Sequence, residues 1–141
     1  MKQSLREARR WSSQAEDDLK FAKWIAKEKH FFDKGCFITQ QAGEKILKAC
    51  LYASGERQVF GHSLYELAQD LVRLDSKAES IVDQAKLLDR FYIPTRYPNG
   101  LPGGVPFQTF GENDLQDAIS SVEKIFAFCK HFLRKVESHS E

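Results

Sequence analysis

The sequence is poor in the features that build disulfide frameworks, zinc sites and membrane spans. It has only three cysteines, Cys36, Cys50 and Cys129, which are far apart and never spaced as C-x-x-C. This pattern argues against disulfides and structural zinc and is typical of buried thiols in a cytoplasmic protein. No apolar run approaches the roughly 20 residues of a membrane span, and the Arg-rich start lacks the apolar core of a signal peptide. We therefore expect a soluble, cytoplasmic protein that holds no metal and contacts no membrane.

Excess charge and glycine-rich phosphate loops are absent as well. The formal net charge is only +1, so nothing in the total requires nucleic acid, and we expect no DNA partner. Neither G-x-x-x-x-G-K-[ST] nor G-x-G-x-x-G occurs in the chain. If a nucleotide binds, its phosphates must be held by side chains and not by a backbone cradle.

Proline is rare and confined to one segment. All four prolines lie between Pro94 and Pro106, and Gly100, Gly103 and Gly104 accompany them. Proline lacks an amide hydrogen and fixes φ, so no helix crosses this region. The resulting loop has about twenty residues, and loops of that length in compact domains are usually functional or mobile.

The rest of the chain shows helical periodicity and no alternating strand pattern. Three S-x-x-E capping boxes begin at Ser4, Ser63 and Ser76 and precede apolar residues at helical spacing, and Gln116 occupies the capping position of the last helix. We predict an all-α, antiparallel up-and-down bundle in one domain, residues 1–141, with about five helices. The predicted helices run from about Ser4 to Lys29, from after Asp33 to a left-handed cap at Gly55, from Leu64 to Leu74, from Ala78 to Tyr92, and onward from about Asn113.

The stretch from Gln40 to Ala49 is apolar on one side of its helix and densely polar on the other. Lys45 and Lys48 lie three residues apart and share a face, and Glu44 lies four before Lys48, which favours an ion pair. A solvated face with one ion pair would explain this pattern. Gly43 is unusual there, because glycine costs about 1 kcal/mol relative to alanine in a helix interior. Close approach of another backbone would account for it.

These residues resemble the HEPN domain family. The string Q-Q-A-G-E-K-I-L-K-A, beginning at Gln40, matches the family's second helix. His62 to Leu67 matches H-x-L-x-x-L at the third helix, and Arg96-Tyr97-Pro98 matches the R-Y-P that follows the fourth. The opening around Trp11 is similar to the family's first helix. Within the family, the chain is most similar to the sacsin-type HEPN domain, which ends a very large chaperone-like protein.

The resemblance implies a four- or five-helix bundle that forms homodimers. Some branches of the family bind nucleotides, and others are ribonucleases that use an arginine and a histidine four to six residues apart. For a sacsin-type domain it implies the excised C-terminus of a longer chain that follows a J domain. The expected activity is binding of GTP or ATP without turnover, in support of Hsp70-linked protein folding. The resemblance thus implies a nucleotide, a second copy and Hsp70-type chaperone machinery as partners, and no cofactor.

Arg57 and His62 keep the ribonuclease alternative open. Four residues separate them, histidine is suited to proton transfer near neutral pH, and arginine can bind phosphate through two nitrogens. However, Gly55 and Gly61 bracket the pair, which predicts a turn between helices. In the nuclease branches the pair lies after the third helix, where this chain has no histidine. We therefore predict a binding module and keep a metal-independent ribonuclease using Arg57 and His62 as the alternative.

A nucleotide needs cations for its phosphates and an aromatic or apolar surface for its base. The long loop carries Arg96 and Tyr97, which are suited to either role, although both side chains would equally well anchor the loop on the bundle. No catalytic base, metal cluster or nucleophile accompanies them. The candidate nucleotide-binding residues are Lys45, Lys48, Arg90, Arg96 and Tyr97, with Tyr92 and Phe107 as further stacking surfaces.

Overall fold

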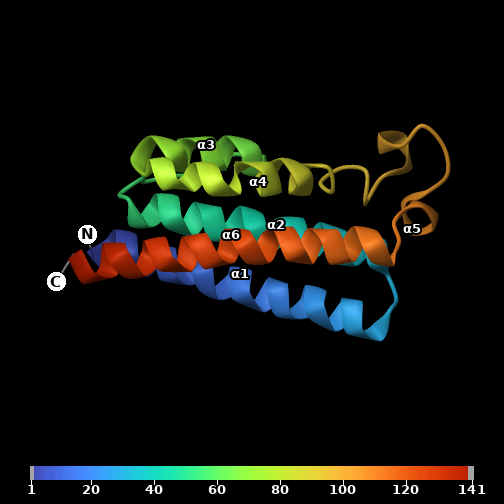
Figure 1. Cartoon of the computed structure of the whole chain (residues 1–141), viewed down its shortest axis with the longest axis horizontal. Coiled ribbons are helices and arrows are strands. Elements are labelled where there is room, and N and C mark those ends of the chain that lie inside the picture. Colours follow the sequence, from blue (N-terminus) through green and yellow to red (C-terminus); the bar gives the residue numbers. More distant parts are fainter. Residues whose placement is uncertain (1, 140–141) are drawn as a thin grey trace.

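The computed structural model describes residues 2–139, and within that range it contains helices and loops but no strand. The predicted all-helical bundle is confirmed (Figure 1). The elements are α1 (Lys2–Glu28), α2 (Phe32–Ala53), α3 (Leu64–Leu74), the 3-10 helix η1 (Ser76–Ile81), α4 (Val82–Asp89), the 3-10 helix η2 (Pro98–Gly100), α5 (Pro106–Thr109) and α6 (Glu112–His139).

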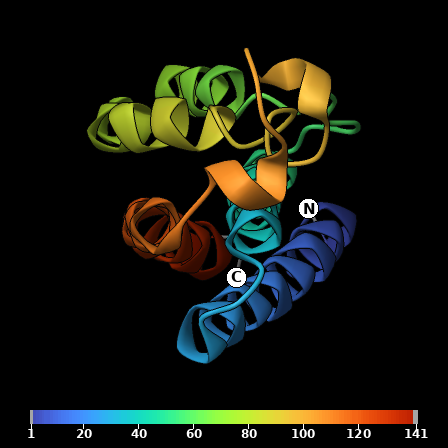
Figure 2. The ribbon, with the colours of Figure 1, turned by 90° about the vertical axis from the view of Figure 1, so that its right-hand side faces the viewer.

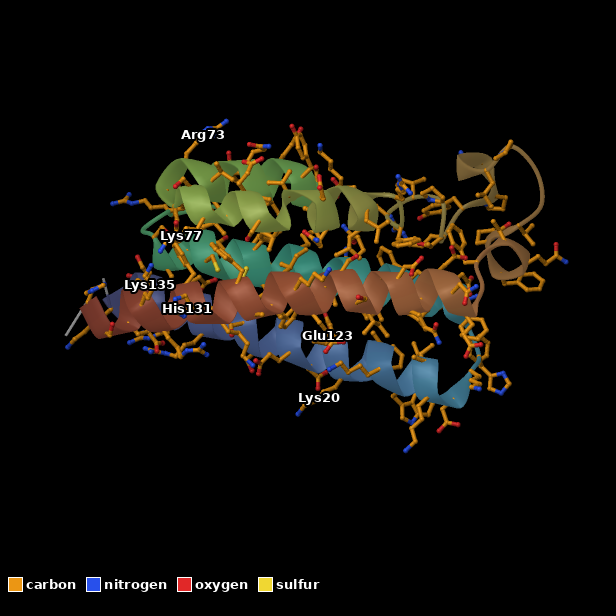
Figure 3. All side chains as sticks on the ribbon, in the orientation of Figure 1. Lys20, Arg73, Lys77, Glu123, His131 and Lys135 are labelled. Atoms are coloured by element: carbon orange, nitrogen blue, oxygen red, sulfur yellow. The ribbon has the colours of Figure 1, made fainter. Side chains whose placement is uncertain are left out.

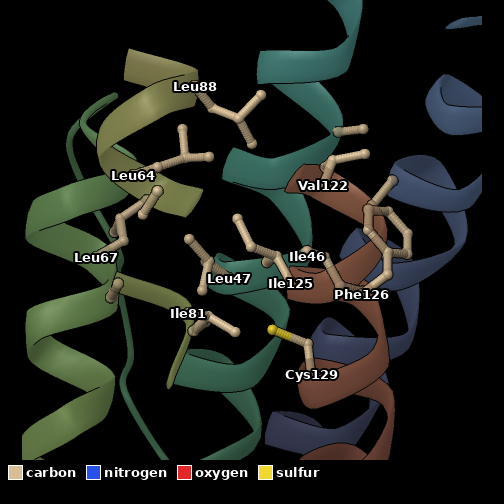
Figure 4. Packing of buried hydrophobic residues seen from close by; sticks show 14 of the residues in the cluster. Ile46, Leu47, Leu64, Leu67, Ile81, Leu88, Val122, Ile125, Phe126 and Cys129 are labelled. Carbon is tan, nitrogen blue, oxygen red and sulfur yellow. The ribbon is translucent and has the colours of Figure 1, made fainter. Parts of the chain in front are cut away.

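Helix α2 is the centre of the bundle. It packs against α1, α3, α4, α5 and α6, and Figure 2 shows it surrounded by α1, α6 and the layer that α3 and α4 form. Its buried side chains Ile46 and Leu47 meet apolar residues of three other helices in the core (Figure 4). These are Leu64 and Leu67 from α3, Leu88 from α4, and Val122, Ile125 and Phe126 from α6.

The connection between α2 and α3 gives α3 the same direction as α2. The start of α3 lies beside the middle of α2, because Leu64 is the nearest neighbour of a side chain at Gly43. The end of α3 lies beside the end of α2, where Leu51 and Leu74 line one hollow. The segment 54–63 therefore runs back along α2 before α3 begins. This is an exception to the simple antiparallel order that short loops would give.

The helix ends agree with the sequence in part. Ser63 caps α3 and accepts a hydrogen bond from the Glu66 amide at 3.2 Å, as predicted. The helix expected to start at Ser4 already begins at Lys2. The cap expected at Ser76 is Asp75, which accepts from the Lys77 amide, and the element that follows is a 3-10 helix. At α6 the capping side chain is Asp114 and not Gln116, since Asp114 accepts from the Gly111 amide at 2.8 Å.

Helices α1 and α6 are antiparallel and joined by a ladder of surface ion pairs. Their members recur every seven residues on both helices, so the pairs lie on one side of each helix. The pairs are Arg9–Glu137 at 3.3 Å, Lys130–Glu16 at 2.7 Å and Lys23–Glu123 at 3.3 Å. Within residues 2–139 no helix is long and apolar enough to cross a membrane.

Gly43 allows α2 to pack closely against three helices. A Cβ atom there would lie 2.6 Å from Leu64 Cδ2, 3.3 Å from Leu88 Cδ1 and 3.4 Å from Val122 Cγ2. The neighbours are side chains, whereas the sequence suggested an approaching backbone. All three are fully buried, so they have little room to move.

We predict that Gly43→Ala lowers the free energy of unfolding by about 1 kcal/mol, because overpacking outweighs the better helix propensity of alanine. The matched control is Gly103→Ala, where the added methyl group meets open space; it should change stability by less than about 0.5 kcal/mol. Urea denaturation measures both. A stabilised Gly43→Ala variant would show that the three side chains move aside easily.

Candidate functional site

The site is built around a carboxylate and an ammonium group that α2 holds inside the molecule. Lys48 Nζ lies 3.1 Å from Glu44 Oε2, and the two side chains are only 7% and 6% exposed. The i,i+4 spacing on one helix places them together, as predicted. Trp11 of α1 covers the pair, with the Lys48 ammonium 5.4 Å from its ring centre. Burial makes this a fixed polar site, in contrast to a solvated face.

His62 completes the site from the loop before α3. Its Nδ1 lies 3.3 Å from Glu44 Oε2, and its ring stacks on Tyr92 with 5.1 Å between ring centres. The backbone is fixed as well, because the His62 carbonyl accepts a hydrogen bond from Gln40 Nε2 at 3.1 Å. The next residues are tied to α4 through Asp89, which accepts from Ser63 Oγ and from the amides of Leu64 and Tyr65.

The contact with Glu44 determines which ring nitrogen of a neutral His62 carries the hydrogen. An ionised Glu44 can only accept hydrogen bonds, so in the neutral ring Nδ1 carries the hydrogen and Nε2 keeps its lone pair. The side chain of His62 is 60% exposed although its partner Glu44 is buried. The result is an oriented imidazole with a basic nitrogen available to a ligand.

Arg96 lies in a cluster of aromatic rings that includes Tyr92, the ring on which His62 stacks. Its guanidinium carbon lies 4.4 Å from the ring centre of Phe37, 4.7 Å from Tyr92 and 5.2 Å from Tyr97. Its Nε donates to the Tyr92 carbonyl at 2.8 Å, which leaves the outer guanidinium nitrogens for other acceptors. His62 and Arg96 thus share Tyr92 as a common support. Arg96 and Tyr97 are both exposed.

The predicted phosphate-binding residues fall into two groups. Lys45 lies 2.6 Å from Asp18 of α1, and Lys48 is paired with Glu44, so both cations already have carboxylate partners. Arg90 and Arg96 are exposed in the segment after α4, and only Arg96 joins the aromatic cluster. The structure therefore places Arg96 and Tyr97 in the aromatic cluster around Tyr92, on which His62 stacks, while the two lysines serve contacts within the bundle. Their roles in binding stay predictions.

The R-x4-H pair is separated in space. Arg57 lines a hollow with Ser4, Glu7 and Tyr52 at the end of α2, whereas His62 contacts Glu44 in its middle. Tyr52 and Glu44 are eight residues apart, which is about 12 Å along a helix. Arg57 and His62 make no mutual contact among the described residues. The arginine that shares an aromatic contact with His62 is Arg96, through Tyr92.

Other nucleophiles and metal ligands do not accompany the site in the described part of the chain. All three cysteines are buried, and burial, with the nearby Asp114 and Asp33 carboxylates, raises the pKa of the Cys36 thiol to about 12. Burial also raises the pKa of Cys50 well above its ordinary value. Both therefore stay protonated at neutral pH and are poor nucleophiles. Residues 2–139 contain no group of three or more residues able to hold a metal ion.

The sequence matches the HEPN domain family over residues 8–132. The chain belongs to the HEPN domain family. Among solved structures it is similar to a Thermus thermophilus protein, with 34% identity, a TM-score of 0.83, and coverage of 89% of this chain and 98% of that one. An archaeal HEPN homologue has 29% identity, a TM-score of 0.74, and coverage of 90% and 98%. A HEPN domain protein of Thermotoga maritima has 29% identity, a TM-score of 0.69, and coverage of 89% and 98%.

A curated relative carries a functional name. It is a candidate toxin of Methanocaldococcus jannaschii, 25% identical over 144 residues, which cover 94% of this chain and 91% of that protein. The family assignment made from the motifs is thereby confirmed. The finer resemblance to sacsin-type domains, and with it the placement at the end of a longer chain, stays a prediction.

We predict that Lys48→Met destabilises this HEPN domain by about 3 kcal/mol, because it leaves the buried Glu44 charge without its ammonium partner. Lys20→Met is the matched control, since Lys20 is exposed and has no ion pair among the described residues. It should change the free energy of unfolding by less than about 0.5 kcal/mol. Equal, small changes in both variants would mean that Glu44 is compensated by His62 and by Gln41, whose Nε2 donates to Glu44 Oε1 at 3.5 Å.

Proposed function

We propose that this HEPN domain is a metal-independent ribonuclease in which His62 is the general base and Arg96 binds the phosphate. The observation that carries the proposal is the contact between His62 Nδ1 and Glu44. It orients an exposed imidazole and leaves Nε2 as a proton acceptor, while the exposed Arg96 contacts Tyr92, the ring on which that imidazole stacks. This is the arrangement that proton abstraction next to a phosphate requires.

The residues suit cleavage by the RNA's own 2′-hydroxyl group. His62 Nε2 takes the proton of that hydroxyl, and the 2′ oxygen forms a bond to the adjacent phosphorus. The bond from phosphorus to the 5′ oxygen breaks, and this oxygen takes a proton from solvent or from the imidazolium. Arg96 offers its outer nitrogens to the phosphate oxygens, whose charge grows in the transition state. The products are a 2′,3′-cyclic phosphate and a 5′-hydroxyl, and no metal ion is needed.

The comparisons favour this activity over a purely binding role. Some branches of the HEPN family are ribonucleases, and a relative that covers nearly the whole chain is named as a candidate toxin. The proposal keeps the histidine of the R-x4-H alternative and replaces its arginine. Arg57 contacts a different part of the surface, whereas Arg96 shares Tyr92 with His62.

We predict that His62→Gln lowers the rate of RNA cleavage by about 100-fold or more, because glutamine keeps a hydrogen bond to Glu44 but has no basic nitrogen. His30→Gln, at the exposed junction of α1 and α2, is the matched control and should cleave like the parent. The assay follows a labelled single-stranded RNA in the presence of a chelator and identifies the product ends.

Three outcomes would contradict the proposal. Cleavage that survives His62→Gln would come from another group or a contaminant. Cleavage that requires a divalent ion would exclude the mechanism above. If Arg57→Gln lowered the rate as His62→Gln does while Arg96→Gln did not, Arg57 would be the working partner and the assignment of Arg96 would fail.

A second candidate function is nucleotide binding by a homodimer, as in sacsin-type domains. The observation that favours it is Arg96 among the rings of Phe37, Tyr92 and Tyr97, which together offer a cation and a stacking surface. Such a module would bind GTP or ATP without turnover. The chaperone-like parent chain and its Hsp70-type partners are implied by the resemblance alone.

We predict for this candidate that titration of GTP or ATP gives saturable heat, and that Arg96→Ala abolishes it because the guanidinium no longer meets the phosphates. Arg90→Ala is the control, since Arg90 is exposed nearby but lies outside the aromatic cluster. Light scattering in the same buffer gives the mass of the binding species. A dimer without heat would leave dimerisation and exclude nucleotide binding.

A further inference from the structure

An excess of positive charge lies at the end of the bundle where α1 begins and α6 ends. The two ends lie side by side, as the Arg9–Glu137 and Lys130–Glu16 pairs show (Figure 1). Residues 2–10 and 130–139 carry seven Lys or Arg and only two Glu, although the whole chain has 21 and 20. We call the Lys and Arg side chains of these two segments the terminal basic face; the half-buried Lys135 marks its α6 part in Figure 3.

The terminal basic face is hollowed. On α1, Arg6, Arg9 and Arg10 line a cavity of about 760 Å³ together with Glu7, Ser13, Gln14 and Lys45. Arg10 pairs with Glu7 and Lys45 with Asp18, so the lining keeps an excess of positive charge. A second hollow of about 170 Å³ lies between α1 and α6, where Arg9, Lys130, Arg134 and Glu137 stand around an apolar floor. Arg9 and Lys130 belong to the ion-pair ladder with Glu137 and Glu16. Arg9 belongs to both hollows, so they form one continuous surface. Hydroxyl and amide groups beside guanidinium groups suit a ligand with many anionic oxygens.

The residue composition of the face indicates which class of partner it would bind. Nine large hydrophobic residues are exposed in the described range, and none of them belongs to residues 2–10 or 130–139. A membrane-inserting surface or an apolar protein interface would need such side chains here. Four of the chain's eight arginines lie on the face, and arginine matches phosphate with two nitrogens. A phosphodiester backbone fits these features better than a lipid surface or an apolar partner.

The face also connects to His62 through direct contacts. Trp11 lines the larger hollow and lies under Lys48, Lys48 pairs with Glu44, and Glu44 contacts His62. The Trp11 ring stacks on Tyr52 on another side, so it supports this path and is not open for base stacking. Arg96 contacts Phe37 and Trp11 contacts Lys48, eleven residues further along α2, so about 16 Å of helix separates the two places. An RNA strand several nucleotides long would span this distance.

We infer that the terminal basic face binds the phosphate backbone of single-stranded RNA and guides it to His62. The inference rests on the proposed ribonuclease function and names its substrate as an RNA strand several nucleotides long. Mononucleotides and dinucleotides would not reach both places. Binding at the face is electrostatic and independent of sequence, so it weakens as salt increases.

The test measures binding of a fluorescent single-stranded RNA oligonucleotide by anisotropy over a range of salt, with His62→Gln present in every variant to prevent cleavage. One variant combines Arg6→Gln, Arg10→Gln and Arg134→Gln. The matched control combines Lys20→Gln, Lys27→Gln and Arg73→Gln, which removes the same charge from exposed residues elsewhere; Arg73 pairs with Asp70 three residues before it, as Arg10 does with Glu7. We expect about tenfold or weaker binding and a salt slope smaller by up to about 3 for the arginine variant only.

Equal losses in the two variants would overturn the inference, because they would reflect net charge alone. Unchanged binding in the arginine variant would overturn it as well. The outcome is separable from that of the proposed function, since cleavage is measured with the parent His62. If RNA binds at the face but is never cleaved, the ribonuclease proposal is refuted and the RNA-binding role of the face is retained. If the arginine variant cleaves RNA normally at low RNA concentration, only the RNA-binding role of the face is refuted.

Discussion

Glu44 is a buried charged residue on α2, a helix that is packed on nearly every side. Much of the surrounding structure compensates this charge. The ammonium group of Lys48 lies against it, Trp11 covers that ammonium, and the His62 imidazole closes the remaining side. Unpaired, the carboxylate would cost several kcal/mol. The same arrangement that compensates the charge also fixes the orientation of a histidine at the surface. The same contacts therefore stabilise the buried Glu44 and orient His62.

The fold was predictable from the sequence because its signals are local. Apolar residues recur at helical spacing, the prolines are confined to one segment, and Ser63 and Gly55 terminate helices as their residue types suggest. The capping at Ser76 and Gln116 was mistaken because acidic residues nearby, Asp75 and Asp114, compete for the same amides. The direction of α3 depends on how the segment 54–63 folds back, and no local pattern encodes that path.

The site was predictable only in its parts. The Glu44–Lys48 pair follows from a four-residue spacing, but its burial depends on Trp11 and His62, which other elements supply. Glu44 and His62 are 18 residues apart, and Lys45 and Asp18 are 27 apart, so neither pairing has a sequence signature. The R-x4-H spacing links His62 to Arg57, but the two residues have different neighbours in the structure. The arginine that contacts the same ring as His62 is Arg96, which is distant in sequence.

The ion-pair ladder between α1 and α6 also determines how these two helices are aligned lengthwise. Its signs alternate, with Arg9, Glu16 and Lys23 opposite Glu137, Lys130 and Glu123. Sliding α1 by seven residues one way would set Arg9 against Lys130 and Glu16 against Glu123. Sliding it the other way would set Glu16 against Glu137 and Lys23 against Lys130. Each pair contributes little stability, but a seven-residue slip in either direction brings like charges together, so the ladder disfavours both of these alignments.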